Sequence, residues 1–378
     1  MINWREAVVE ERTGAWPGVV SLSVRTAEGA PLRALAYPAL VGTPRPGDRV
    51  LLNTSALERG LGTGGYALVV ACPDRLPEPP EAGPGHLVKA RYTPLQAMVL
   101  GVDEQESVHH ELLREADSID QMPVVVADLH SALPAIVAGV RALAPQARVA
   151  YVMTDGGALP AWFSRTVAEL RDAGWIAGCL TVGQAFGGDL EAVSVHSGLL
   201  AARHVLGADV TVVAQGPGNL GTGTRWGFSG VSAGEAVNAA AVLGGAPVAS
   251  LRVSASDARA RHVGVSHHSL TAYGRVALAR ADVVVPVLDD ASGVPDAVGG
   301  PEPFNARVAA QVRTLAERHR LVPRLAGAST LAALRTSPVR LSSMGRGLDV
   351  DPTPFLAAAV AGEHAAELLR ADVQGEDA

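Results

Sequence analysis

Residues 210–245 read VTVVAQGPGNLGTGTRWGFSGVSAGEAVNAAAVLGG, and this segment sets the expected architecture. It begins with an unbroken apolar run, 210–214, which is typical of a β-strand buried on both faces. A glycine-rich loop follows, and the Ala-rich run 233–243 after it predicts a helix. Strand, loop and helix in this order are the repeating unit of a parallel α/β sheet.

The same alternation continues on both sides of this segment. Strands are predicted at 123–127, 148–153, 175–182, 209–214, 247–253 and 282–288. Helices are predicted at 132–143, 161–173, 191–206, 233–243, 268–279 and 304–318. Because apolar strands with helical crossovers form buried parallel sheets, we expect a doubly wound, mainly parallel α/β domain over residues 122–345.

Residues 1–92 have a different pattern and predict a separate β-rich, barrel-like domain. Short runs separated by Gly/Pro turns predict strands at 4–11, 19–26, 32–41, 49–53 and 66–72. Strands of this length and spacing are typical of a small antiparallel barrel or sandwich. A further strand at 86–92 is expected to finish the barrel, and the glycine-rich segment 60–65 is interpreted as a hairpin loop.

Two other segments complete the expected organisation. Residues 93–121 form a polar linker or bridge, which follows a Pro-rich stretch at 73–85. Residues 346–378 predict a C-terminal helix and a polar tail, with Thr353 and Pro354 suited to the helix start. The Ala-rich surface of this helix could pack on the body or on a second subunit, and a homodimer is the base-rate expectation.

Composition argues against several classes of function. With 378 residues, 48% of them hydrophobic, the chain fits a globular protein of one large or two ordinary domains. A net charge of −7, the absence of Lys/Arg runs and 4% aromatic residues argue against nucleic acid as the main partner. No apolar run approaches the roughly 18 residues of a membrane span. The first residues lack the apolar core of a signal peptide, so a cytoplasmic location is expected.

The usage of lysine and of cysteine is also informative. Lys89 is the only lysine among the 31 Lys and Arg residues, which together with the abundant Ala, Gly and Pro is typical of a GC-rich bacterial genome. The two cysteines, Cys72 and Cys179, fall in or beside predicted strands and are interpreted as small buried hydrophobes.

The glycine-rich loop after the strand at 209–214 is the first candidate site. Ligands of open α/β sheets lie beyond the carboxyl ends of the strands, and glycine lets backbone N–H groups approach an anion. A phosphate or carboxylate cradle and a purely structural loop are both open. The candidate ligand-binding residues are Gly216, Gly218, Asn219, Gly221, Thr222, Gly223 and Thr224. The string 216–221 matches GxGxxG, but it lies too late in the domain to favour NAD.

The polar segment after the strand at 247–253 is the second candidate site. Its candidate ligand-binding residues are Arg252, Ser254, Asp257, Arg259, Arg261 and His268. Ser266 is predicted to cap a helix beginning near His268, which would place His267 and His268 at the positive end of the helix dipole. Imidazoles there should stay neutral near pH 7, and a neutral imidazole can accept a proton or ligate a metal.

Catalytic candidates follow from the same strand ends. His267 or His262 would be the acid/base, with Asp128 or Asp155 as its partner. A turn or capping role is the alternative for Asp155. Ser232 matches a GxSxG string, but it is interpreted as a helix N-cap. A divalent metal is a further alternative, and its ligands could come from Asp128, His130, Asp155, Asp257, His262 and His267.

Three motifs carry a family resemblance. They are Gly-Pro-Gly-Asn-Leu-Gly-Thr-Gly-Thr at 216–224, Arg-x-Arg-His-x-Gly-x-Ser-His-His at 259–268, and Asp128-Leu129-His130-Ser131 with Arg91-Tyr92-Thr93-Pro94 upstream. Over nearly its whole length the chain resembles a bacterial family known as domain of unknown function 3866. The resemblance implies no activity, substrate or catalytic residue.

The residues therefore leave three functions open. The first is an enzyme, such as a hydrolase or transferase, that acts on a small anionic metabolite. The second is a non-catalytic sensor of such a metabolite, which signals through the β domain or the C-terminal helix. The third is an assembly protein whose loops are structural.

Overall fold

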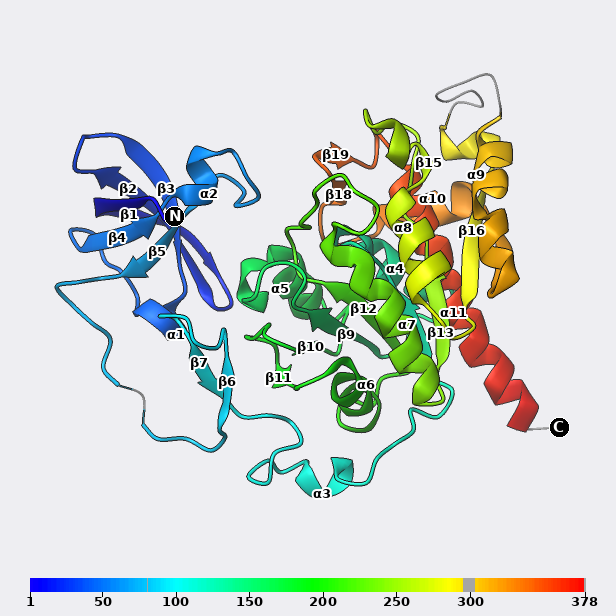
Figure 1. Ribbon diagram of the computed structural model, residues 1–378, viewed down its shortest axis with the longest axis horizontal. Helices are drawn as coiled ribbons and strands as arrows, with labels where there is room; N and C mark the ends of the chain where they lie inside the picture. The colour runs from blue at the N-terminus through cyan, green and yellow to red at the C-terminus, as the bar shows by residue number, and fades with distance from the viewer. Residues whose placement is uncertain (80, 295–302, 377–378) are drawn as a thin grey trace.

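The computed structural model describes residues 1–79, 81–294 and 303–376 and has two lobes (Figure 1). The N-terminal lobe is a small β barrel, and the larger lobe is an α/β sandwich. An extended segment, which contains β6 (Leu87–Lys89), β7 (Ala97–Val99) and α3 (His110–Leu113), runs along one side of the molecule and joins the lobes. The fold class expected from the sequence is confirmed.

The barrel is closed by five strands in the order β1-β2-β3-β5-β4. They are β1 (Trp4–Trp16), β2 (Val19–Thr26), β3 (Pro31–Ala36), β4 (Arg49–Asn53) and β5 (Ala67–Ala71), with the short helices α1 (Pro38–Val41) and α2 (Ser55–Glu58) between them. The pairs are antiparallel except β3 with β5, which run parallel. Alternate apolar residues such as Leu22, Val24 and Leu52 point inward and fill the barrel.

The strand expected at 86–92 does not complete the barrel. Instead β6 (Leu87–Lys89) pairs with β7 (Ala97–Val99) in a separate hairpin. The physical reason is Lys89, whose buried Nζ donates hydrogen bonds of 2.9 Å to the carbonyl oxygens of Ala185 and Ala192 in the larger lobe. A buried ammonium needs such partners, so this hairpin is attached to the α/β lobe.

The α/β lobe contains an eight-stranded sheet in which every pair is parallel, in the order β11-β10-β9-β12-β8-β13-β16-β17. The strands are β8 (Pro123–Val126), β9 (Val149–Thr154), β10 (Gly178–Thr181), β11 (Leu190–Glu191), β12 (Val210–Gln215), β13 (Ala246–Ser250), β16 (Asp282–Leu288) and β17 (Arg320–Ala326). Strands β11 and β17 were not expected from the sequence. Both lie at sheet edges, where an unbroken apolar run is not needed and Pro323 is tolerated.

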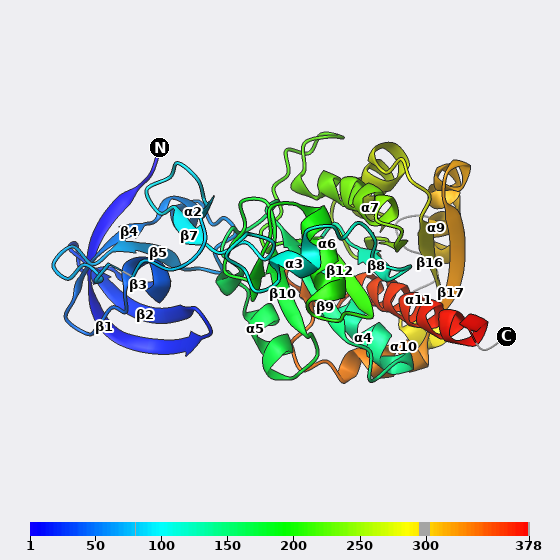
Figure 2. The same cartoon turned by 90° about the horizontal axis from the view of Figure 1, so that it is seen from below.

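Helices cover both faces of this sheet (Figure 2). One face packs against α4 (Leu133–Leu143), α5 (Arg165–Asp172), α10 (Ala328–Arg335) and α11 (Thr353–Glu376). The other packs against α6 (Val195–His204), α7 (Ala233–Val242), α8 (His267–Thr271) with the π-helical turn Ala272–Val276, and α9 (Phe304–Val312) with the 3-10 turn Arg313–Glu317. Two short ribbons, β14 (Val253–Ser254) with β15 (Gly264–Val265) and β18 (Ser342–Ser343) with β19 (Arg346–Gly347), lie beyond the strand ends.

The C-terminal helix α11 packs on the body of the lobe, directly against α4. The contact is close because both helices carry a glycine at the crossing. A Cβ atom on Gly139 would lie 1.9 Å from the carbonyl oxygen of Ala359, and one on Gly362 would lie 2.0 Å from that of Ile136. The two backbones therefore touch, and α11 buries Phe355 and Leu356 between α4 and the central strands.

Trp162 joins the two lobes. Its backbone oxygen accepts a 2.7 Å hydrogen bond from the indole nitrogen of Trp16, and its ring centroid lies 6.1 Å from that of Tyr37. Gly18 sits so close to this ring that a Cβ atom would lie 2.3 Å from Cγ of Trp162. The barrel thus contacts the 3-10 turn Ala161–Phe163, which directly precedes α5.

Two expectations from composition can be compared with the fold. Cys72 and Cys179 are both buried and unpaired, as expected. Within the described ranges, no helix combines the length and the apolar character that crossing a membrane would require.

Candidate functional site

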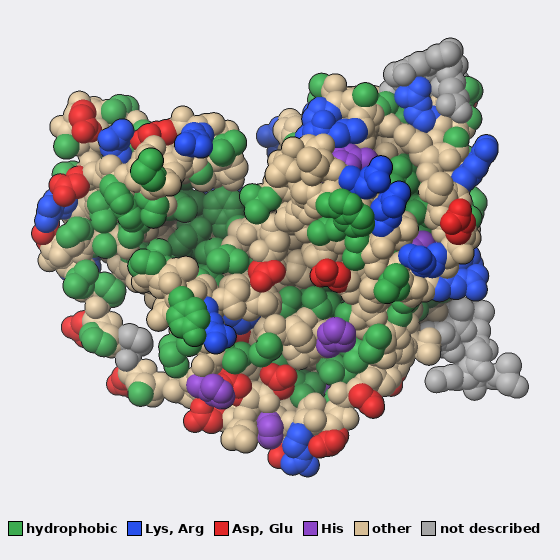
Figure 3. Space-filling model, viewed as in Figure 1, with side chains coloured by type: hydrophobic (Ala, Val, Ile, Leu, Met, Phe, Trp, Pro, Cys, Tyr) green, Lys and Arg blue, Asp and Glu red, His purple; other side chains and the backbone are tan. Residues whose placement is uncertain are grey.

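A cleft of about 530 Å³ lies beyond the carboxyl ends of β8, β12 and β13. Figure 3 shows the surface hollowed between the two lobes, with Arg and His side chains gathered on the α/β lobe beside the hollow. Ten of the predicted ligand-binding and catalytic residues line the cleft: Gly216, Gly218, Asn219, Gly221, Gly223, Arg252, Arg259, Arg261, His262 and His268. The two candidate segments, which are far apart in the sequence, therefore form one site.

The glycine-rich loop is held in place by its own backbone and by Gln215, the last residue of β12. Gln215 Nε2 donates to the carbonyl oxygen of Asp128 at 2.8 Å and to Oδ1 of Asn219 at 2.9 Å. The neighbouring turn allows no side chain, because a Cβ atom on Gly157 would lie 2.1 Å from the carbonyl oxygen of Gly216. The loop thus has a fixed path along the cleft.

The hydroxyl groups of Thr222 and Thr224 make hydrogen bonds within the glycine-rich loop. Their hydroxyl oxygens lie 3.1 Å apart, and Thr224 Oγ1 accepts a 3.1 Å hydrogen bond from the N–H of Gly227. These bonds hold the tip of the loop as a tight turn. Neither threonine lines the cleft, although both are predicted ligand-binding residues.

Ser266 organises the His/Arg segment. It caps α8, since its Oγ accepts from the N–H of His268 at 3.2 Å, as the sequence predicts. The same oxygen lies 2.7 Å from Nδ1 of His262, which sits on the 3-10 turn Ala260–His262. His267 and His268 occupy the first turn of α8, and Ser266 therefore contacts both the imidazole of His262 and the start of the helix that carries the other two histidines.

The three imidazole rings form a compact cluster. Ring centroids lie 5.0 Å apart for His262 and His267, 5.0 Å for His262 and His268, and 4.4 Å for His267 and His268. One nitrogen from each ring lies within 4.8 Å of the others. The ring of Phe228 stacks on His268 with centroids 3.9 Å apart and planes 2° from parallel.

All three histidines are expected to be neutral at pH 7. Burial, together with nearby positive charges that include Arg252, lowers the pKa of His262 and of His268 to about 3. The pKa of His267 is also lowered, first by burial and then by Arg261. The sequence predicts neutrality from the helix dipole, whereas burial and the arginines are its causes in the structure.

Two of the arginines have carboxylate partners. Nε and Nη2 of Arg259 each donate to the carboxylate of Asp257 at 2.9 Å, and the positive charge holds the Asp257 pKa well below its usual range. Arg252 is buried, with Nη2 3.9 Å from Asp257. Arg261 differs, because it is exposed and no carboxylate within residues 1–79, 81–294 and 303–376 pairs with it. Its Nη2 lies 3.8 Å from where a Cβ atom on Gly223 would be, beside the glycine-rich loop.

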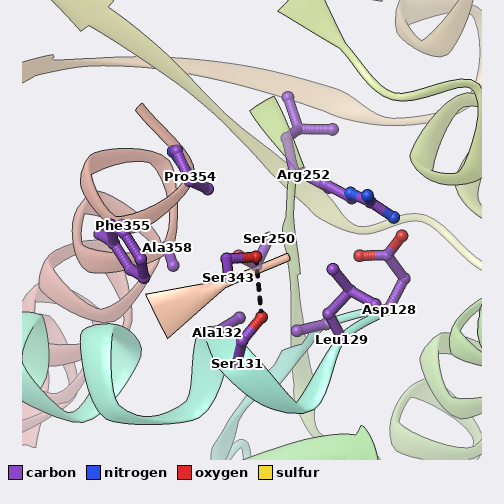
Figure 4. Close-up of a pocket in the computed structure, with 12 residues that line it drawn as sticks. Asp128, Leu129, Ser131, Ala132, Ser250, Arg252, Ser343, Pro354, Phe355 and Ala358 are labelled. Carbon is purple, nitrogen blue, oxygen red and sulfur yellow. Dashed lines mark hydrogen bonds between the residues drawn. The ribbon is translucent and has the colours of Figure 1, made fainter. Parts of the chain in front are cut away.

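Asp128 lies beneath the cleft, where it faces Arg252 across a small cavity of about 20 Å³ (Figure 4). Its carboxylate is buried, and Oδ2 has no hydrogen-bond partner among the described residues. Burial raises the pKa of Asp128, while the charge of Arg252 opposes the rise. Asp128 is thus placed to hold Arg252 and does not line the cleft.

Asp155 and His130 have other partners. Asp155 is exposed and accepts a 2.9 Å hydrogen bond from the N–H of Gln184, as a turn residue would. His130 lines the cleft, but Nδ1 lies 3.0 Å from the Tyr151 hydroxyl and Nε2 lies 2.7 Å from Ser164 Oγ. In the part of the chain that the structure describes, no hydrogen bond links Asp128 or Asp155 to His262 or His267.

Ser254, predicted to bind a ligand, and Ser232, predicted to cap a helix, both have other hydrogen-bond partners in the structure. Ser254 Oγ donates to Asp351 Oδ2 at 2.6 Å, which ties the segment to the start of α11. Ser232 precedes α7 but makes no side-chain capping bond, because its hydroxyl donates to the carbonyl oxygen of Ser229 at 3.2 Å.

Sequence reasoning missed several residues of the site. Phe228 stacks on His268, Gln215 fixes the glycine-rich loop, and Ser342 and Met344 line the cleft from the β18–β19 ribbon. Gly62, in the loop expected to be a simple hairpin, reaches the cleft from the barrel. Gln215 directly follows a predicted strand and could have been found, whereas the others are placed only by tertiary packing.

A family model described as "Protein of unknown function (DUF3866)" matches residues 33–362. The chain belongs to this family. The DUF3866 match begins in β3 and ends in α11, so it leaves out β1 and β2 of the barrel but includes the glycine-rich loop and the His/Arg segment. No curated protein and no solved structure matches the chain.

Proposed function

We propose that this protein binds a small anionic metabolite, with a phosphate or carboxylate group, in the cleft between the glycine-rich loop and the His/Arg segment. The observation that carries the proposal is the position of Arg261, an arginine without a carboxylate partner in the described ranges, beside Gly223 of the loop. A guanidinium with five N–H donors is suited to the planar or tetrahedral oxygens of such a group.

The charges around the cleft support an anion. Asp257 offsets Arg259, and Asp128 faces Arg252, whereas Arg261 is an arginine of the cleft with no carboxylate partner among the described residues. The three histidines are neutral and add no negative charge. The glycine-rich loop contributes backbone N–H groups, which bind anions where no side chain keeps the ligand away.

An enzyme, a hydrolase or a transferase, is the first form of this function. His267 supports it, because its Nε2 atom is buried without a hydrogen-bond partner among the described residues. A neutral imidazole can act as a general base, and because His267 does not itself line the cleft, its ring would have to turn to reach a bound substrate. Neither Asp128 nor Asp155 is placed to orient it, so His267 would act without a carboxylate partner.

A non-catalytic metabolite sensor is the second form, and the contact of Gly62 with the cleft favours it. A ligand there would touch both lobes, and its binding would change how the barrel rests on the α/β lobe. The two forms differ in whether the ligand leaves chemically altered. The assembly role that the sequence left open would need no ligand at all.

The test is isothermal titration with inorganic phosphate and with acetate in EDTA-containing buffer, for the wild type and for Arg261→Ala. We expect one saturable site, weakened at least about tenfold in the variant, because one hydrogen bond to a charged group contributes about 1.5–3 kcal/mol. Arg12→Ala, which removes an exposed arginine of the barrel, is the control and should bind as the wild type does. Equal affinity in all three proteins would contradict the proposal.

The proposal includes a bacterial cytoplasmic setting and a homodimer. The composition and the two unpaired cysteines support the first, since disulfides are rare in reducing compartments. The second rests on base rates alone, and light scattering coupled to size-exclusion chromatography would decide it.

A further inference from the structure

His267 has a nitrogen that the fold leaves without a partner. Its Nε2 atom is enclosed by protein, yet it makes no hydrogen bond to any described residue. A buried polar atom of this kind costs free energy unless a ligand or an ion satisfies it. The adjacent rings of His262 and His268 make an ion the better explanation, because each adds a further nitrogen within 4.8 Å.

We propose that His262, His267 and His268 form a binding centre for one divalent transition-metal ion of the zinc class, with a coordination position open toward the cleft. Three imidazoles plus one open position are the ligand set of many zinc centres. Nitrogens bound to one zinc lie about 3.3 Å apart, given bond lengths of 2.0–2.1 Å, so small rotations of the rings close the site. Imidazole ligands favour zinc, copper, nickel or iron over magnesium and calcium.

Ser266 is placed to orient the first ligand. Metal-binding histidines usually hydrogen-bond through their second nitrogen, and the hydroxyl 2.7 Å from Nδ1 of His262 provides that bond and directs Nε2 at the ion. Phe228 holds the plane of the His268 ring by stacking on it. Arg252 Nη1 lies 3.5 Å from Nδ1 of His268, which is too far for a strong bond and leaves either nitrogen able to bind.

The charged residues around the three histidines indicate which kind of ligand would occupy the open coordination position of the ion. Asp257 and Asp128 lie opposite Arg259 and Arg252, so a divalent ion would meet one uncompensated arginine, Arg261. An anionic ligand that bridges the ion and Arg261 would balance both. In this respect the inference rests on the proposed function, whereas binding of the ion itself does not.

The experiment uses the full chain after dialysis against EDTA. Zinc alone is titrated calorimetrically, and cobalt is titrated while the visible spectrum is recorded. We expect one ion per chain and an intense cobalt spectrum, as low-symmetry nitrogen coordination gives. His267→Ala should weaken zinc binding at least 100-fold, and Ser266→Ala about 10- to 100-fold, the usual range for a residue that orients a ligand.

Two further variants serve as controls for the loss of zinc binding. His196→Ala removes an exposed histidine of α6 and should leave zinc affinity unchanged. His267→Gln tests the ligand with a side chain of similar size, in case the alanine variant does not fold. No saturable zinc binding by the wild type, or equal affinity in the wild type and His267→Gln, overturns the metal centre.

The metal proposal and the anion proposal can fail separately. Phosphate binding to the metal-free chain without zinc binding would leave the anion site and remove the metal centre. Zinc binding lost in His267→Gln, without phosphate binding to the metal-free or the zinc-loaded chain, would support the metal centre and remove the anion site.

Discussion

Asp257 holds Arg259, two residues further along the chain, through two parallel hydrogen bonds of 2.9 Å each. The same carboxylate lies 3.5 Å from Nη2 of Arg346 on the β18–β19 ribbon and 3.9 Å from Nη2 of Arg252. One buried acid therefore joins the His/Arg segment to the ribbon that closes the cleft.

Asp257→Asn should lower the free energy of unfolding by about 2–3 kcal/mol. Removing one partner of a buried ion pair costs about 3–5 kcal/mol, and the water that reaches Arg259 reduces this figure. Urea denaturation measures the change. Asp74→Asn is the matched control, since Asp74 accepts two similar hydrogen bonds from Arg49 at 2.9 and 2.8 Å, but on the exposed surface of the barrel. Its cost should stay below about 1 kcal/mol, and equal losses would contradict the hub role of Asp257.

Gly157→Ala should displace the glycine-rich loop. The added methyl group would lie 2.1 Å from the carbonyl oxygen of Gly216, so the loop must move. We expect a loss of about 1–3 kcal/mol in stability from overpacking and a clear drop in phosphate affinity. Calorimetry and denaturation measure the two effects. Gly83→Ala, where a Cβ atom meets nothing within 4 Å, should change neither, and an unchanged phosphate affinity in Gly157→Ala would mean that the loop path is not part of the site.

Stability should fall as the pH drops through the window set by His130. Burial lowers the pKa of His130 to about 4, whereas the value in the unfolded chain is about 6.5. Between pH 4 and pH 6.5 the unfolded state binds more protons than the folded state. The contribution of neutral His130 to the free energy of unfolding is therefore complete above pH 6.5 and is lost as the pH falls toward 4. His130 alone should account for about 2 kcal/mol between pH 8 and pH 5.

The measurement for His130 is the free energy of unfolding at several pH values, for the wild type and for His130→Gln. The variant loses the titrating group, so its stability should depend less steeply on pH in this window, whatever its absolute stability. Parallel curves for the two proteins would show that His130 titrates alike in the folded and unfolded states.

Trp162→Ala should loosen the barrel from the α/β lobe. The variant removes the ring that packs against Tyr37 and Gly18 but keeps the backbone oxygen that Trp16 contacts. We expect a larger radius of gyration in small-angle scattering and a stability loss of about 2 kcal/mol, below the 3–5 kcal/mol of a fully buried tryptophan. Trp226→Ala, which removes an exposed tryptophan of the glycine-rich loop, should not change the radius. Identical scattering in Trp162→Ala and the wild type would argue against Trp162 as the joint.

The parallel sheet could be predicted from the sequence because its central strands are buried on both faces and are therefore apolar throughout. A run such as 210–214 is short, apolar and followed by a Gly/Pro-rich loop, which together indicate a buried strand. The edge strand β17 reads RLVPRLA, in which charged and apolar residues mix, so periodicity alone does not reveal it. The position of the β6–β7 hairpin depends on Lys89, whose Nζ donates to the carbonyl oxygens of Ala185 and Ala192, about a hundred residues further along the chain. A contact between such distant residues cannot be predicted from local sequence periodicity.

The sequence predicts those site residues that directly follow the ends of the strands. It does not predict residues whose side chains are engaged by a neighbouring turn, or residues that reach the cleft through contacts between distant segments. Arg252, His262 and the glycines reach the cleft because parallel strands end on the same side. Asp155 also follows a strand, yet a neighbouring turn uses its carboxylate. The stacking of Phe228 on His268 and the approach of Gly62 from the barrel depend on contacts between distant segments.

The glycine contact between α4 and α11 bears on how the protein is made. Strands β8 and β13 lie in the interior of the sheet, but α11, which covers one of their faces, comes far later in the chain. While the ribosome translates the intervening residues, the barrel can already close, whereas the sheet still carries a bare apolar face. The α/β lobe should therefore mature only after synthesis has passed Gly362, and until then chaperones that hold exposed apolar segments are expected to bind the nascent chain.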